Sequence, residues 1–472
     1  MIMYNHIRDS ESEEMPVNVK AVILAGGKGK RMKSDLPKVL STICGDTLIR
    51  HVEANIREAN IGDIAAVTGY KSELVRENAG EGLTYFLQEE QLGTAHALNC
   101  ARSFFENEDC SVIVLCGDAP LVSGETISDL VSFFDKNDAD ICVLSAKLPD
   151  PAGYGRIVRG GDGTFERIVE KRDATPEQIL INEVNSGTII FRSGALTAAL
   201  DEIMSKEPQN AQGEYYLTDT IEITASRGGR VFAFSAADPN VVMGANDRYE
   251  LSLCEKAMRE SINRRLMLEG VRMIDPACTY IDRHVKVAEG CVIYPNTVIT
   301  GSTQIGRNNT IYSSRIDAST IGDNNLIDSS VLESCLIGDE NTVGPFAHLR
   351  KDTVLSCRTK VGSFSETKAS SIGEGTKIPH LSYVGDAQVG KRVNFGCGCV
   401  TANYDGNQKH PTVIKDDAFI GCNVNLIAPV TVGSASYIAA GSSVSRDVPD
   451  GTLVIERSKR REHKAKLIKK QG

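Results

Sequence analysis

The sequence predicts two parts of different construction, an α/β domain with a mainly parallel sheet and then a parallel β-helix. Short apolar segments alternate with amphipathic segments between Lys20 and Phe234, a pattern typical of α/β domains. A helical spacing follows from Asp247 to Leu268. In the last third of the chain, aliphatic residues return every six positions, which is the period of a solenoid.

Composition limits the class of protein. The chain has 472 residues with a formal charge of −10, so it is long enough for two or three domains. Apolar residues make up 41% and charged residues 24%, which are globular values. No apolar run approaches the roughly 20 residues of a spanning helix, and no aromatic residues interleave with basic ones as a nucleic-acid surface would require. We expect neither membrane insertion nor nucleic-acid binding.

The cysteines and the N-terminus indicate the compartment. The 13 cysteines form no C-x-x-C pair, so neither a disulfide framework nor a zinc site is expected. Residues 1–18 are acidic and lack the basic start and apolar middle of a secretory signal. A cytoplasmic protein with an acidic N-terminal tail is expected.

The α/β part begins with four apolar runs that predict buried strands: Ala21–Leu24, Ile64–Thr68, Ser111–Cys116 and Ile141–Ser145. Helices are predicted between them at Leu48–Glu58 and Thr126–Phe134. Strands alternating with helices favour a parallel sheet, and ligands of such sheets bind at the carboxyl ends of the strands.

A long helix is predicted to join the two parts. Its apolar residues lie about one turn apart at Tyr249, Leu253, Met258, Ile262 and Leu266, and Gly270 is a stop signal. The predicted limits are a tail at 1–18, an α/β domain at 19–246, a linker helix at 247–270, a β-helix at 271–455 and a basic tail at 456–472.

The sixfold spacing occurs in three runs: Ile281, Val287, Ile293, Ile299, Ile305 and Ile311; then Ile337, Val343, Leu349, Leu355 and Val361; then Ile414, Ile420, Leu426, Val432, Ile438 and Val444. Such hexapeptide repeats predict a parallel β-helix in which aliphatic side chains stack inward. The seven cysteines from Cys278 to Cys422 are interpreted as compact core or turn residues.

The repeat is interrupted after Val400, where Thr401–Pro411 forms a polar insertion. Loops that project from a rigid repeat scaffold are candidate binding elements. An idle surface loop is the alternative.

A glycine-rich segment, Leu24–Met32, follows the first predicted strand, and Lys38 comes shortly after. Glycines allow the backbone to approach a phosphate, while Arg31 and Lys38 supply positive charge. The segment is neither a P-loop nor a dinucleotide fingerprint, since Met32 stands where the third glycine should be. It predicts a nucleotide site, and a simple tight turn is the alternative.

Further motifs narrow this prediction: Gln88-x-x-Gln91-Leu92-Gly93-Thr94-Ala95-His96, Gly117–Leu121, Tyr154–Ile157, Ile168–Glu170, Glu183–Gly187 and Gly213–Asp219. With the hexapeptide repeats, they make the chain from about Val19 to Arg457 resemble the bacterial bifunctional N-acetylglucosamine-1-phosphate uridylyltransferases and glucosamine-1-phosphate acetyltransferases. The resemblance implies a Rossmann-like nucleotidylyltransferase domain, a left-handed β-helix and a homotrimer. It also implies acetylation of glucosamine-1-phosphate by acetyl-coenzyme A. Uridylyl transfer from UTP then gives UDP-N-acetylglucosamine and pyrophosphate for cell-envelope synthesis.

For uridylyl transfer, the resemblance assigns Arg31 and Lys38 to the phosphates, and Asp118 and Asn246 to Mg²⁺. It assigns a further set to UTP or the sugar nucleotide: Leu24, Ala25, Gly26, Gly27, Gln88, Gly93, Thr94, Cys116, Gly155, Glu170 and Asn185. Gly155, Glu170 and Asn185 hold the sugar within this set. Without the resemblance, Asp118 is equally well an Asx turn after a strand. Cys116 stands where relatives often have Tyr, and Lys30 where they often have Thr.

For acetyl transfer, the resemblance makes His380 the general base, for which a structural turn residue is the alternative. Arg350 and Lys368 would bind the sugar phosphate, and Tyr383 and Asn394 the sugar. The acetyl-coenzyme A set is Cys397, Asn403, Tyr404, Lys409, Cys422, Ala440 and Arg457. Lys409 is expected in a site shared between neighbouring subunits. Cysteine nucleophiles are conceivable at 397 and 422, but direct attack by an amine on a thioester needs no acyl-enzyme.

Two rival functions are weighed against this one. A single-activity sugar nucleotidylyltransferase would use the β-helix only for assembly and would not need His380, Arg350 and Lys368 together. A non-catalytic assembly subunit would not need Asp118, Arg31 and Lys38. All of these residues are present.

Overall fold

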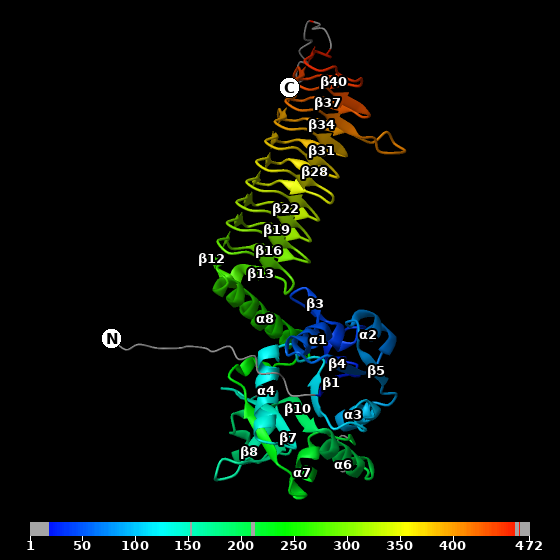
Figure 1. Cartoon of the computed structure of the whole chain (residues 1–472), viewed down its shortest axis with the longest axis vertical. Helices are drawn as coiled ribbons and strands as arrows, with labels where there is room; N and C mark the ends of the chain where they lie inside the picture. The colour runs from blue at the N-terminus through cyan, green and yellow to red at the C-terminus, as the bar shows by residue number, and fades with distance from the viewer. Residues whose placement is uncertain (1–17, 152, 209–212, 458–461, 463–472) are drawn as a thin grey trace, which may run out of the picture. The chain divides into compact units, whose positions relative to one another are not determined.

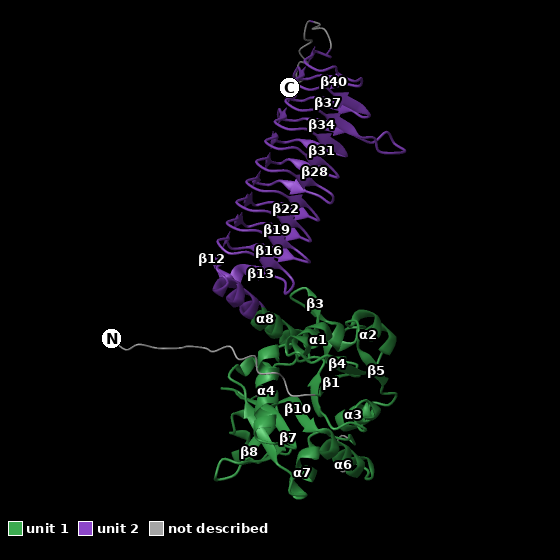
Figure 2. Ribbon diagram, in the orientation of Figure 1, with its two compact units in different colours: residues 1–258 green, residues 259–472 purple. Residues whose placement is uncertain are grey.

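The computed structural model describes residues 18–151, 153–208, 213–457 and 462. The chain divides into two compact units, Met1–Met258 and Arg259–Gly472 (Figure 2). The division falls within helix α8 (Arg248–Leu268). The domain limits predicted from the sequence stay predictions. The predicted acidic tail, Asn18 apart, and most of the predicted basic tail after Arg457 lie outside the described residues.

Unit 1 is built on a nine-stranded sheet in the order β11-β7-β10-β6-β1-β4-β5, in which β8 also pairs with β10 and β9 pairs with β8 (Figure 1). The strands are β1 (Val19–Ala25), β4 (Asp63–Thr68), β5 (Thr84–Leu87), β6 (Ser111–Cys116), β7 (Ile141–Lys147), β8 (Arg156–Arg159), β9 (Phe165–Val169), β10 (Glu183–Arg192) and β11 (Val231–Ser235). Strand β1 is parallel to β4 and β6, whereas β10 is antiparallel to β6 and β7. The predicted mainly parallel sheet is confirmed.

The helices of unit 1 cover both faces of this sheet. They are α1 (Leu48–Glu58), α2 (Ser72–Asn78), α3 (Thr94–Cys100), α4 (Gly124–Lys136), α5 (Pro176–Ile179), α6 (Ser193–Met204) and α7 (Asp219–Ser226). Successive residues of a strand point to opposite faces. Ile23 therefore joins a buried cluster with α1 and α4, while Val22 joins one with α3 and α6. Burial on both faces explains why the strands read as continuous apolar runs.

Short elements complete unit 1. Strands β2 (Thr42–Ile43) and β3 (Asp46–Thr47) form a separate two-stranded sheet. The 3₁₀ turns of unit 1, in the part that the structure describes, are η1 (Lys30–Met32), η2 (Lys38–Leu40), η3 (Arg102–Phe104) and η4 (Pro239–Val242), and η5 (Pro276–Cys278) belongs to unit 2. Turns η1 and η2 are the segments that carry the basic residues of the glycine-rich motif, so local backbone structure fixes where these charges lie.

Helix α8 has sequence-encoded ends. The Asp247 carboxylate accepts the backbone N–H groups of Tyr249 and Glu250, each at 2.9 Å, as an N-terminal cap does. Gly270 follows the helix with φ of 99°, a left-handed conformation that suits glycine. Of the apolar residues spaced along this helix, Leu266 is buried, whereas Tyr249 in the first turn is 72% exposed.

Unit 2 is a parallel β-helix with three sheets, here named faces 1, 2 and 3 (Figure 1). Face 1 consists of β12 (Arg272–Met273), β15 (Val292–Ile293), β18 (Thr310–Tyr312), β21 (Leu326–Asp328), β24 (Thr342–Val343), β27 (Lys360–Ser363), β30 (Lys377–His380), β33 (Asn394–Phe395), β36 (Phe419–Ile420), β39 (Tyr437–Ile438) and β41 (Leu453–Val454).

Face 2 consists of β13 (Thr279–Ile281), β16 (Thr297–Thr300), β19 (Arg315–Asp317), β22 (Val331–Glu333), β25 (His348–Leu349), β28 (Glu366–Lys368), β31 (Tyr383–Gly385), β34 (Val400–Ala402), β37 (Asn425–Ile427) and β40 (Ser443–Val444). Face 3 consists of β14 (Lys286–Val287), β17 (Gln304–Ile305), β20 (Thr320–Ile321), β23 (Leu336–Ile337), β26 (Val354–Leu355), β29 (Ser371–Ile372), β32 (Ala387–Val389), β35 (Thr412–Ile414) and β38 (Val430–Val432).

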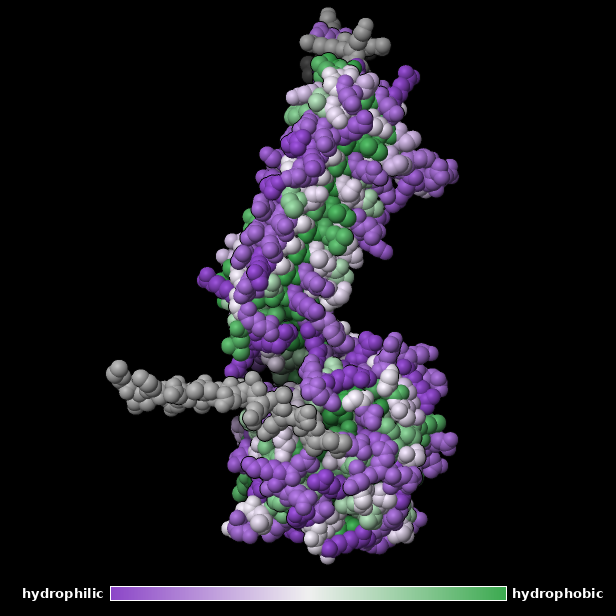
Figure 3. Space-filling model, in the orientation of Figure 1, coloured by the Kyte–Doolittle hydropathy of each residue, from purple (hydrophilic) through white to green (hydrophobic). Residues whose placement is uncertain are grey.

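The hexapeptide period is the step from one face to the next. Ile281, Val287 and Ile293 lie on faces 2, 3 and 1 in turn, and each is buried. Ile281 lies opposite Ile299 of the next coil, so equivalent aliphatic side chains stack along the axis. The predicted parallel β-helix is confirmed. Figure 3 shows that apolar residues also form a band on the side of unit 2 that is turned toward the viewer.

The predicted polar insertion is shorter than the sequence suggested. Strand β34 continues to Ala402, and Thr401 is buried in the solenoid. Its hydroxyl donates to Gly385 O at 3.0 Å and accepts from Gly385 N–H at 2.8 Å. A small polar side chain whose hydroxyl is satisfied can thus replace an inward aliphatic one. The projecting loop comprises residues 403–411, between β34 and β35 (Figure 1).

None of the described helices is both long enough and apolar enough to cross a membrane.

Candidate active sites

The candidate site of unit 1 lies where adjacent parallel strands end. Leu24 pairs with Cys116, Ala25 with Thr68, and Thr68 with Leu87. Strands β6, β1, β4 and β5 therefore end at one edge of the sheet. The glycine-rich segment begins in the last residues of β1, Gln88 directly follows β5, and Asp118 is the second residue after β6. The structure thus brings these predicted residues to the edge where ligands of α/β sheets bind.

The glycine-rich segment is packed too closely for side chains at two positions. A Cβ on Gly26 would lie 2.9 Å from Gln88 Oε1. Gly29 has φ of 66°, and a Cβ there would lie 2.6 Å from Lys38 Cβ. Gln88 is buried, and its Nε2 donates to Gly93 O at 3.1 Å. Gln88 therefore connects the glycine-rich segment to the Gly93–Thr94 motif.

The Gly93–Thr94 motif connects the start of α3 to the Gly213–Asp219 motif. Gly93 has φ of 113°, and a Cβ there would lie 2.4 Å from Tyr215 O. The Thr94 hydroxyl accepts the Leu217 N–H at 3.0 Å. Thr94, predicted to contact the nucleotide, thus also has a structural role. Tyr215 lies in the Gly213–Asp219 motif, but the sequence predicted no contact for it. Gly93, which packs against the Tyr215 backbone, is the residue that could have indicated the contact.

A cluster of charges lies at the centre of this edge. The Lys38 ammonium forms an ion pair with Asp118, and its Nζ lies 3.1 Å from Asn246 Oδ1. Arg31 also donates to Asn246 Oδ1, at 3.0 Å. The Lys38 and Asp118 side chains are 18% and 17% exposed. The structure brings these four predicted residues together. The two cations at this strand edge can bind phosphates, and the carboxylate beside them can bind a divalent cation.

Backbone contacts position the two candidate metal ligands. The Ala245 N–H donates to Asp118 O at 3.1 Å, which ties the segment before α8 to the end of β6. The Asn246 N–H donates to Glu250 Oε2 at 2.9 Å. The sequence did not identify Glu250 as a residue that positions Asn246. Its place four residues after Asn246, at the start of a helix, could have indicated this contact. Both side-chain oxygens contact the same Lys38 ammonium, so they face one point.

A thiol lies beside this cluster at the end of β6. The Cys116 Sγ lies 4.0 Å from Gly187 O, and a Cβ on Gly187 would lie 3.4 Å from that sulfur. Burial raises the pKa of Cys116 to about 12, and the negative charge of Asp118 adds to the shift. The thiol is therefore protonated at neutral pH, and a nucleophilic role for it is disfavoured.

The three predicted sugar-binding residues lie in or beside neighbouring strands: Gly155 directly precedes β8, Glu170 directly follows β9, and Asn185 is in β10. The Asn185 N–H donates to Gly155 O at 2.9 Å, and its side chain accepts the Gly187 N–H at 2.9 Å. The register of β10 against β7 shifts between Asn185 and Ile189, which marks a bulge. A Cβ on Gly155 would lie 3.3 Å from Glu170 Oε1. Desolvation raises the pKa of Glu170, and Asp173 adds to the shift.

In unit 2, five residues form a column along the corner between faces 1 and 2. Ser363 pairs with His380. In the next coil, the pair Lys377–Asn394 lies before the corner and the pair Tyr383–Val400 lies after it, so His380 lies opposite Cys397. The pairs of β33 with β36 and of β34 with β37 likewise place Cys397 opposite Cys422. The pairs of β36 with β39 and of β37 with β40 place Cys422 opposite Ala440. The corner column is Ser363, His380, Cys397, Cys422 and Ala440.

Arg457 belongs to the same corner. Its guanidinium donates to Ala440 O at 3.0 Å. The structure therefore places four of the predicted acetyl-coenzyme A residues, Cys397, Cys422, Ala440 and Arg457, along one line that begins at His380. Asn394 lies just before this corner, at the start of β33. No described residue forms a hydrogen bond or ion pair with the His380 side chain, which is exposed.

Three cations gather at the other end of face 2. Arg350 and Lys368 are equivalent residues of successive coils, since His348 pairs with Glu366. The pKa of Lys368 is lowered, first by Lys409 and then by Arg350. Lysine 409 thus lies beside Lys368 although it comes from the loop. Positive charges brought together without a matching number of anions are suited to a phosphate.

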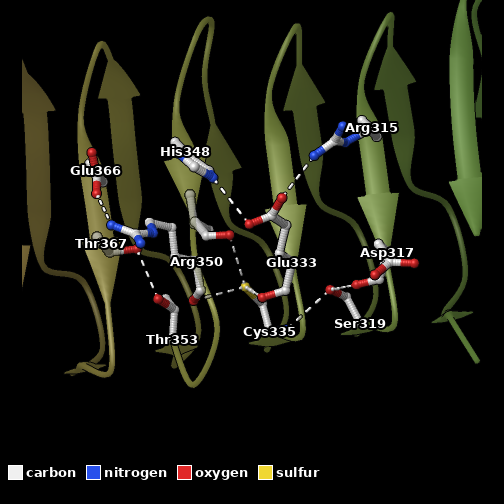
Figure 4. A network of polar contacts seen from close by, with 11 residues as sticks. Arg315, Asp317, Ser319, Glu333, Cys335, His348, Arg350, Thr353, Glu366 and Thr367 are labelled. Carbon is white, nitrogen blue, oxygen red and sulfur yellow. Dashed lines mark hydrogen bonds and ion pairs between the residues drawn. The ribbon is translucent and has the colours of Figure 1, made fainter. Parts of the chain in front are cut away.

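Acidic residues hold two of these cations. Arg350 donates to Glu366 Oε1 at 2.8 Å, and Figure 4 shows this pair beside the contacts of Glu333 with Arg315 and His348. The contact with Glu366 raises the pKa of Arg350. Cys335, in the same view, is buried, and its Sγ lies 3.3 Å from Leu349 O. This core role was predicted for it.

The loop of residues 403–411 is anchored by Asp386. Asn403 donates to the Asp386 carboxylate, and Lys409 Nζ lies 3.6 Å from it. Asn403 Nδ2 also lies 3.5 Å from the Tyr383 hydroxyl. The Tyr404 side chain is 62% exposed, and the Tyr404 backbone forms an antiparallel β-bridge with that of Lys409. Neither Asp386 nor Glu366 was identified from the sequence, because nothing local distinguishes these carboxylates from solvated ones.

The predicted acetyl-transfer residues therefore form two groups on one chain. The corner column lies at the start of face 2, and the cations lie at its end. Tyr383 and Gly385 are the first and last residues of β31 between them. A strand of three residues spans about 10 Å, which is comparable to a hexose phosphate. The two groups can thus contact opposite ends of one such ligand.

Comparisons with known proteins give family matches in both units. The nucleotidyl transferase family model matches residues 20–238, and the GMPPB C-terminal domain model matches residues 276–364. The chain is 45% identical over 452 residues to the bifunctional protein GlmU of Clostridium botulinum (strain ATCC 19397 / Type A), covering 95% of this chain and 98% of the relative.

Two further relatives bear the same name. Bifunctional protein GlmU of Geobacillus sp. (strain WCH70) is 45% identical, with 93% of this chain and 95% of the relative covered. That of Shouchella clausii (strain KSM-K16) is 44% identical, with 95% and 98% covered. Matches of this identity extend over both units, so the chain belongs to the GlmU family of bifunctional proteins.

Proposed function

We propose that this chain makes UDP-N-acetylglucosamine by two reactions, acetyl transfer in unit 2 and uridylyl transfer in unit 1. In the first, glucosamine-1-phosphate and acetyl-coenzyme A give N-acetylglucosamine-1-phosphate and coenzyme A. In the second, that product and UTP give UDP-N-acetylglucosamine and pyrophosphate. The observation that carries the proposal is the similarity to GlmU proteins over both units, including both candidate sites.

For uridylyl transfer, we assign the phosphates to the cluster of Arg31, Lys38 and Asp118. The sugar phosphate attacks the α-phosphorus of UTP, and pyrophosphate leaves. The main barrier is repulsion between two polyanions, so catalysis needs positive charge and positioning. Arg31 and Lys38 supply that charge from the η1 and η2 turns. Gly155, Glu170 and Asn185 are proposed to orient the sugar.

We further propose that Asp118 and Asn246 hold Mg²⁺. The donor set fits, since Mg²⁺ takes oxygen ligands and is usually held by one or two protein side chains together with substrate phosphates. Among the described residues, no group of three His, Cys, Asp or Glu side chains could hold a metal ion alone. When bound, the ion would neutralise phosphate charge. Lys38, which contacts both side chains, would donate to the phosphates.

For acetyl transfer, we assign His380 as the base. The amine of glucosamine-1-phosphate attacks the thioester carbonyl, His380 takes a proton from the nitrogen, and coenzyme A leaves as the thiol after receiving a proton. Arg350 and Lys368 would bind the phosphate, with Tyr383 and Asn394 beside the sugar. Cys397, Cys422 and Ala440 of the corner column would hold acetyl-coenzyme A together with Arg457. Asn403, Tyr404 and Lys409 would contact it from the loop.

A homotrimer is part of the proposal, with Lys409 contributing to a site shared between neighbouring subunits. The support is the family resemblance and the position of Lys409 in a projecting loop. We also assign the protein to the cytoplasm. All thirteen cysteines are free in the structure, in keeping with a reducing compartment. Light scattering of the purified protein would give three chains per particle if the assignment is right.

One assay tests the proposed function. The protein is given Mg²⁺, UTP, glucosamine-1-phosphate and acetyl-coenzyme A, and free thiol and pyrophosphate are followed together. A parallel reaction omits acetyl-coenzyme A. We expect both products, with pyrophosphate dependent on acetyl-coenzyme A. Pyrophosphate from supplied N-acetylglucosamine-1-phosphate without any thiol release would instead identify a single-activity nucleotidylyltransferase, and neither product would indicate an assembly subunit.

A further inference from the structure

Two cysteines of the corner column differ from the others in this chain. All thirteen cysteines lie in the described part of the chain, and only Cys397 and Cys422 among them are exposed. The sequence predicted compact core or turn positions for both, and the resemblance assigned both to acetyl-coenzyme A. The structure confirms that they lie in turns, but it also places them next to each other on the outside of the solenoid, where solutes can reach both thiols.

The register of the coils makes the two cysteines direct neighbours. Asn394 pairs with Phe419 before the turn, and Val400 pairs with Asn425 after it. The two residues of each pair have the same separation in sequence as Cys397 and Cys422, so Cys397 lies opposite Cys422 in the turn. The Asn423 N–H donates to Cys397 O at 2.8 Å, so the ladder continues through the turn.

The spacing of the coils suits a covalent link. Equivalent residues of neighbouring strands lie about 4.8 Å apart, within the range of about 4.4–6.8 Å between the Cα atoms of disulfides. The two turns are in close contact, since a Cβ on Gly396 would lie 2.9 Å from Cys422 Cα. Both side chains leave the same corner in the same register, so the two sulfurs can meet after small rotations at an exposed turn.

The third cysteine of this region cannot replace either partner. Cys399 is buried, and its Sγ lies 3.0 Å from Gly421 O. Burial raises its pKa to about 11. Its thiol is therefore directed into the solenoid and is protonated at neutral pH, so an oxidant would react with Cys397 and Cys422 first.

We propose that Cys397 and Cys422 form a reversible disulfide between two coils, and that this disulfide switches off acetyl transfer. The oxidant is a small disulfide such as glutathione disulfide. The thiolate of one cysteine attacks a sulfur of the oxidant and releases one glutathione thiolate. The second cysteine thiolate attacks the resulting mixed disulfide and releases the other. Two protein thiols and one glutathione disulfide thus become one protein disulfide and two glutathiones, which take up the two protons.

The effect on activity rests on the proposed function. His380 lies on one side of the pair in the corner column, and Ala440 lies on the other, where Arg457 contacts it. A disulfide between Cys397 and Cys422 would change the surface between the proposed base and the proposed acetyl-coenzyme A contacts. The uridylyl site is in unit 1 and contains neither cysteine, so uridylyl transfer should be unaffected.

The test uses the full-length protein equilibrated with mixtures of reduced and oxidised glutathione. Mass spectrometry of peptides identifies the link, and both activities are measured on the same samples before oxidation, after it, and after dithiothreitol. We expect a Cys397–Cys422 linked peptide, loss of two free thiols, at least tenfold slower acetyl transfer that dithiothreitol restores, and unchanged uridylyl transfer.

Two variants act as controls, each compared with its own reduced activity. The double variant Cys397→Ala/Cys422→Ser should show no change in acetyl transfer on oxidation, whereas Cys357→Ala should respond as the natural sequence does. Absence of the linked peptide, or a linked peptide with unchanged acetyl transfer, would overturn the proposal. A reduced protein without acetyl transfer would overturn the proposed function instead, and the linked peptide would still report on the disulfide.

Discussion

Lys38 and Asp118, which are 80 residues apart in the sequence, form an ion pair at the edge of the unit 1 sheet. The lysine comes from the η2 turn after the glycine-rich segment, and the aspartate from the segment after β6. Lys38 also contacts the Asn246 side chain at 3.1 Å. A carboxylate and an amide oxygen therefore contact the same ammonium group. This arrangement favours an exchange in which Lys38 leaves these oxygens and contacts a bound polyphosphate.

Replacing Asp118 by Asn should slow uridylyl transfer by about 10²–10³-fold, the usual effect of removing one preorganised electrostatic contact. The amide keeps the shape of the side chain but lacks the charge that pairs with Lys38 and would hold Mg²⁺. Pyrophosphate release from supplied N-acetylglucosamine-1-phosphate, titrated with Mg²⁺, measures the effect. Asp129→Asn, on the exposed surface of α4, is the matched control. A variant with unchanged Mg²⁺ dependence would refute the ligand role.

Replacing Lys368 by Met should raise the KM for glucosamine-1-phosphate about tenfold through loss of a charge-assisted hydrogen bond. The nearby cations Lys409 and Arg350 lower the pKa of Lys368. Lys368 therefore loses its proton at lower pH than an ordinary lysine, and the KM of the unchanged protein should rise with pH through that range. Initial rates of thiol release at several pH values measure this. Lys360→Met, on face 1, should leave the KM unchanged, and equal effects of the two variants would contradict the assignment.

Replacing Asp405 by Ala should loosen the loop of residues 403–411. The Asp405 carboxylate accepts the N–H groups of Asn407 and Gln408, each at 2.8 Å, and contacts His410 Nε2 at 2.7 Å. The Gln408 N–H, then the His410 side chain and the Asn407 N–H, lower the pKa of Asp405. This ordering is therefore present at neutral pH and is lost only as the pH falls through the lowered pKa.

Hydrogen exchange of the loop amides measures that effect. We expect faster exchange at residues 405–410 in the variant and unchanged exchange in β34 and β35. Asp416→Ala, outside the loop, serves as the comparison. Identical exchange in the variant and the natural sequence would show that the carboxylate does not order the loop.

Replacing Ile311 by Ala should destabilise unit 2 by about 2–5 kcal/mol, the usual cost of removing a buried aliphatic side chain. Ile311 is fully buried on face 1, opposite Ile293 and Ile327 of the neighbouring coils. Leu336 is 55% exposed, so Leu336→Ala should have little effect. Chemical unfolding followed by circular dichroism gives both values. Equal losses would contradict the inward stacking.

The sequence predicted the periodic parts of the fold well because burial imposes a period. Six-residue spacing located the inward side chains, and apolar runs located β1, β4, β6 and β7. Thr401 was misassigned to the loop because its hydroxyl is satisfied by Gly385 inside the solenoid, a contact that no local pattern reveals. Tyr249 fits the apolar spacing of α8 but is exposed, because period alone does not say which helical turns are covered.

The candidate sites were predictable to a similar degree. Glycines, Arg31, Lys38 and Asp118 could be found because phosphate chemistry requires such residues after strand ends. Asp386 and Glu366 could not be found, since their importance depends on which cations lie beside them in the next coil. The adjacency of Cys397 and Cys422 was also hidden, because the inserted loop makes their sequence separation differ from that of other neighbouring coils.

The central claim is that the two reactions occur at separate sites in the two units. The most direct test is His380→Ala, with acetyl transfer and uridylyl transfer measured on the same preparation and His284→Gln as the surface control. We expect that His380→Ala loses acetyl transfer but converts supplied N-acetylglucosamine-1-phosphate and UTP at the rate of the natural sequence. Equal loss of both activities in a folded protein, or acetyl transfer that persists unchanged, would contradict the central claim.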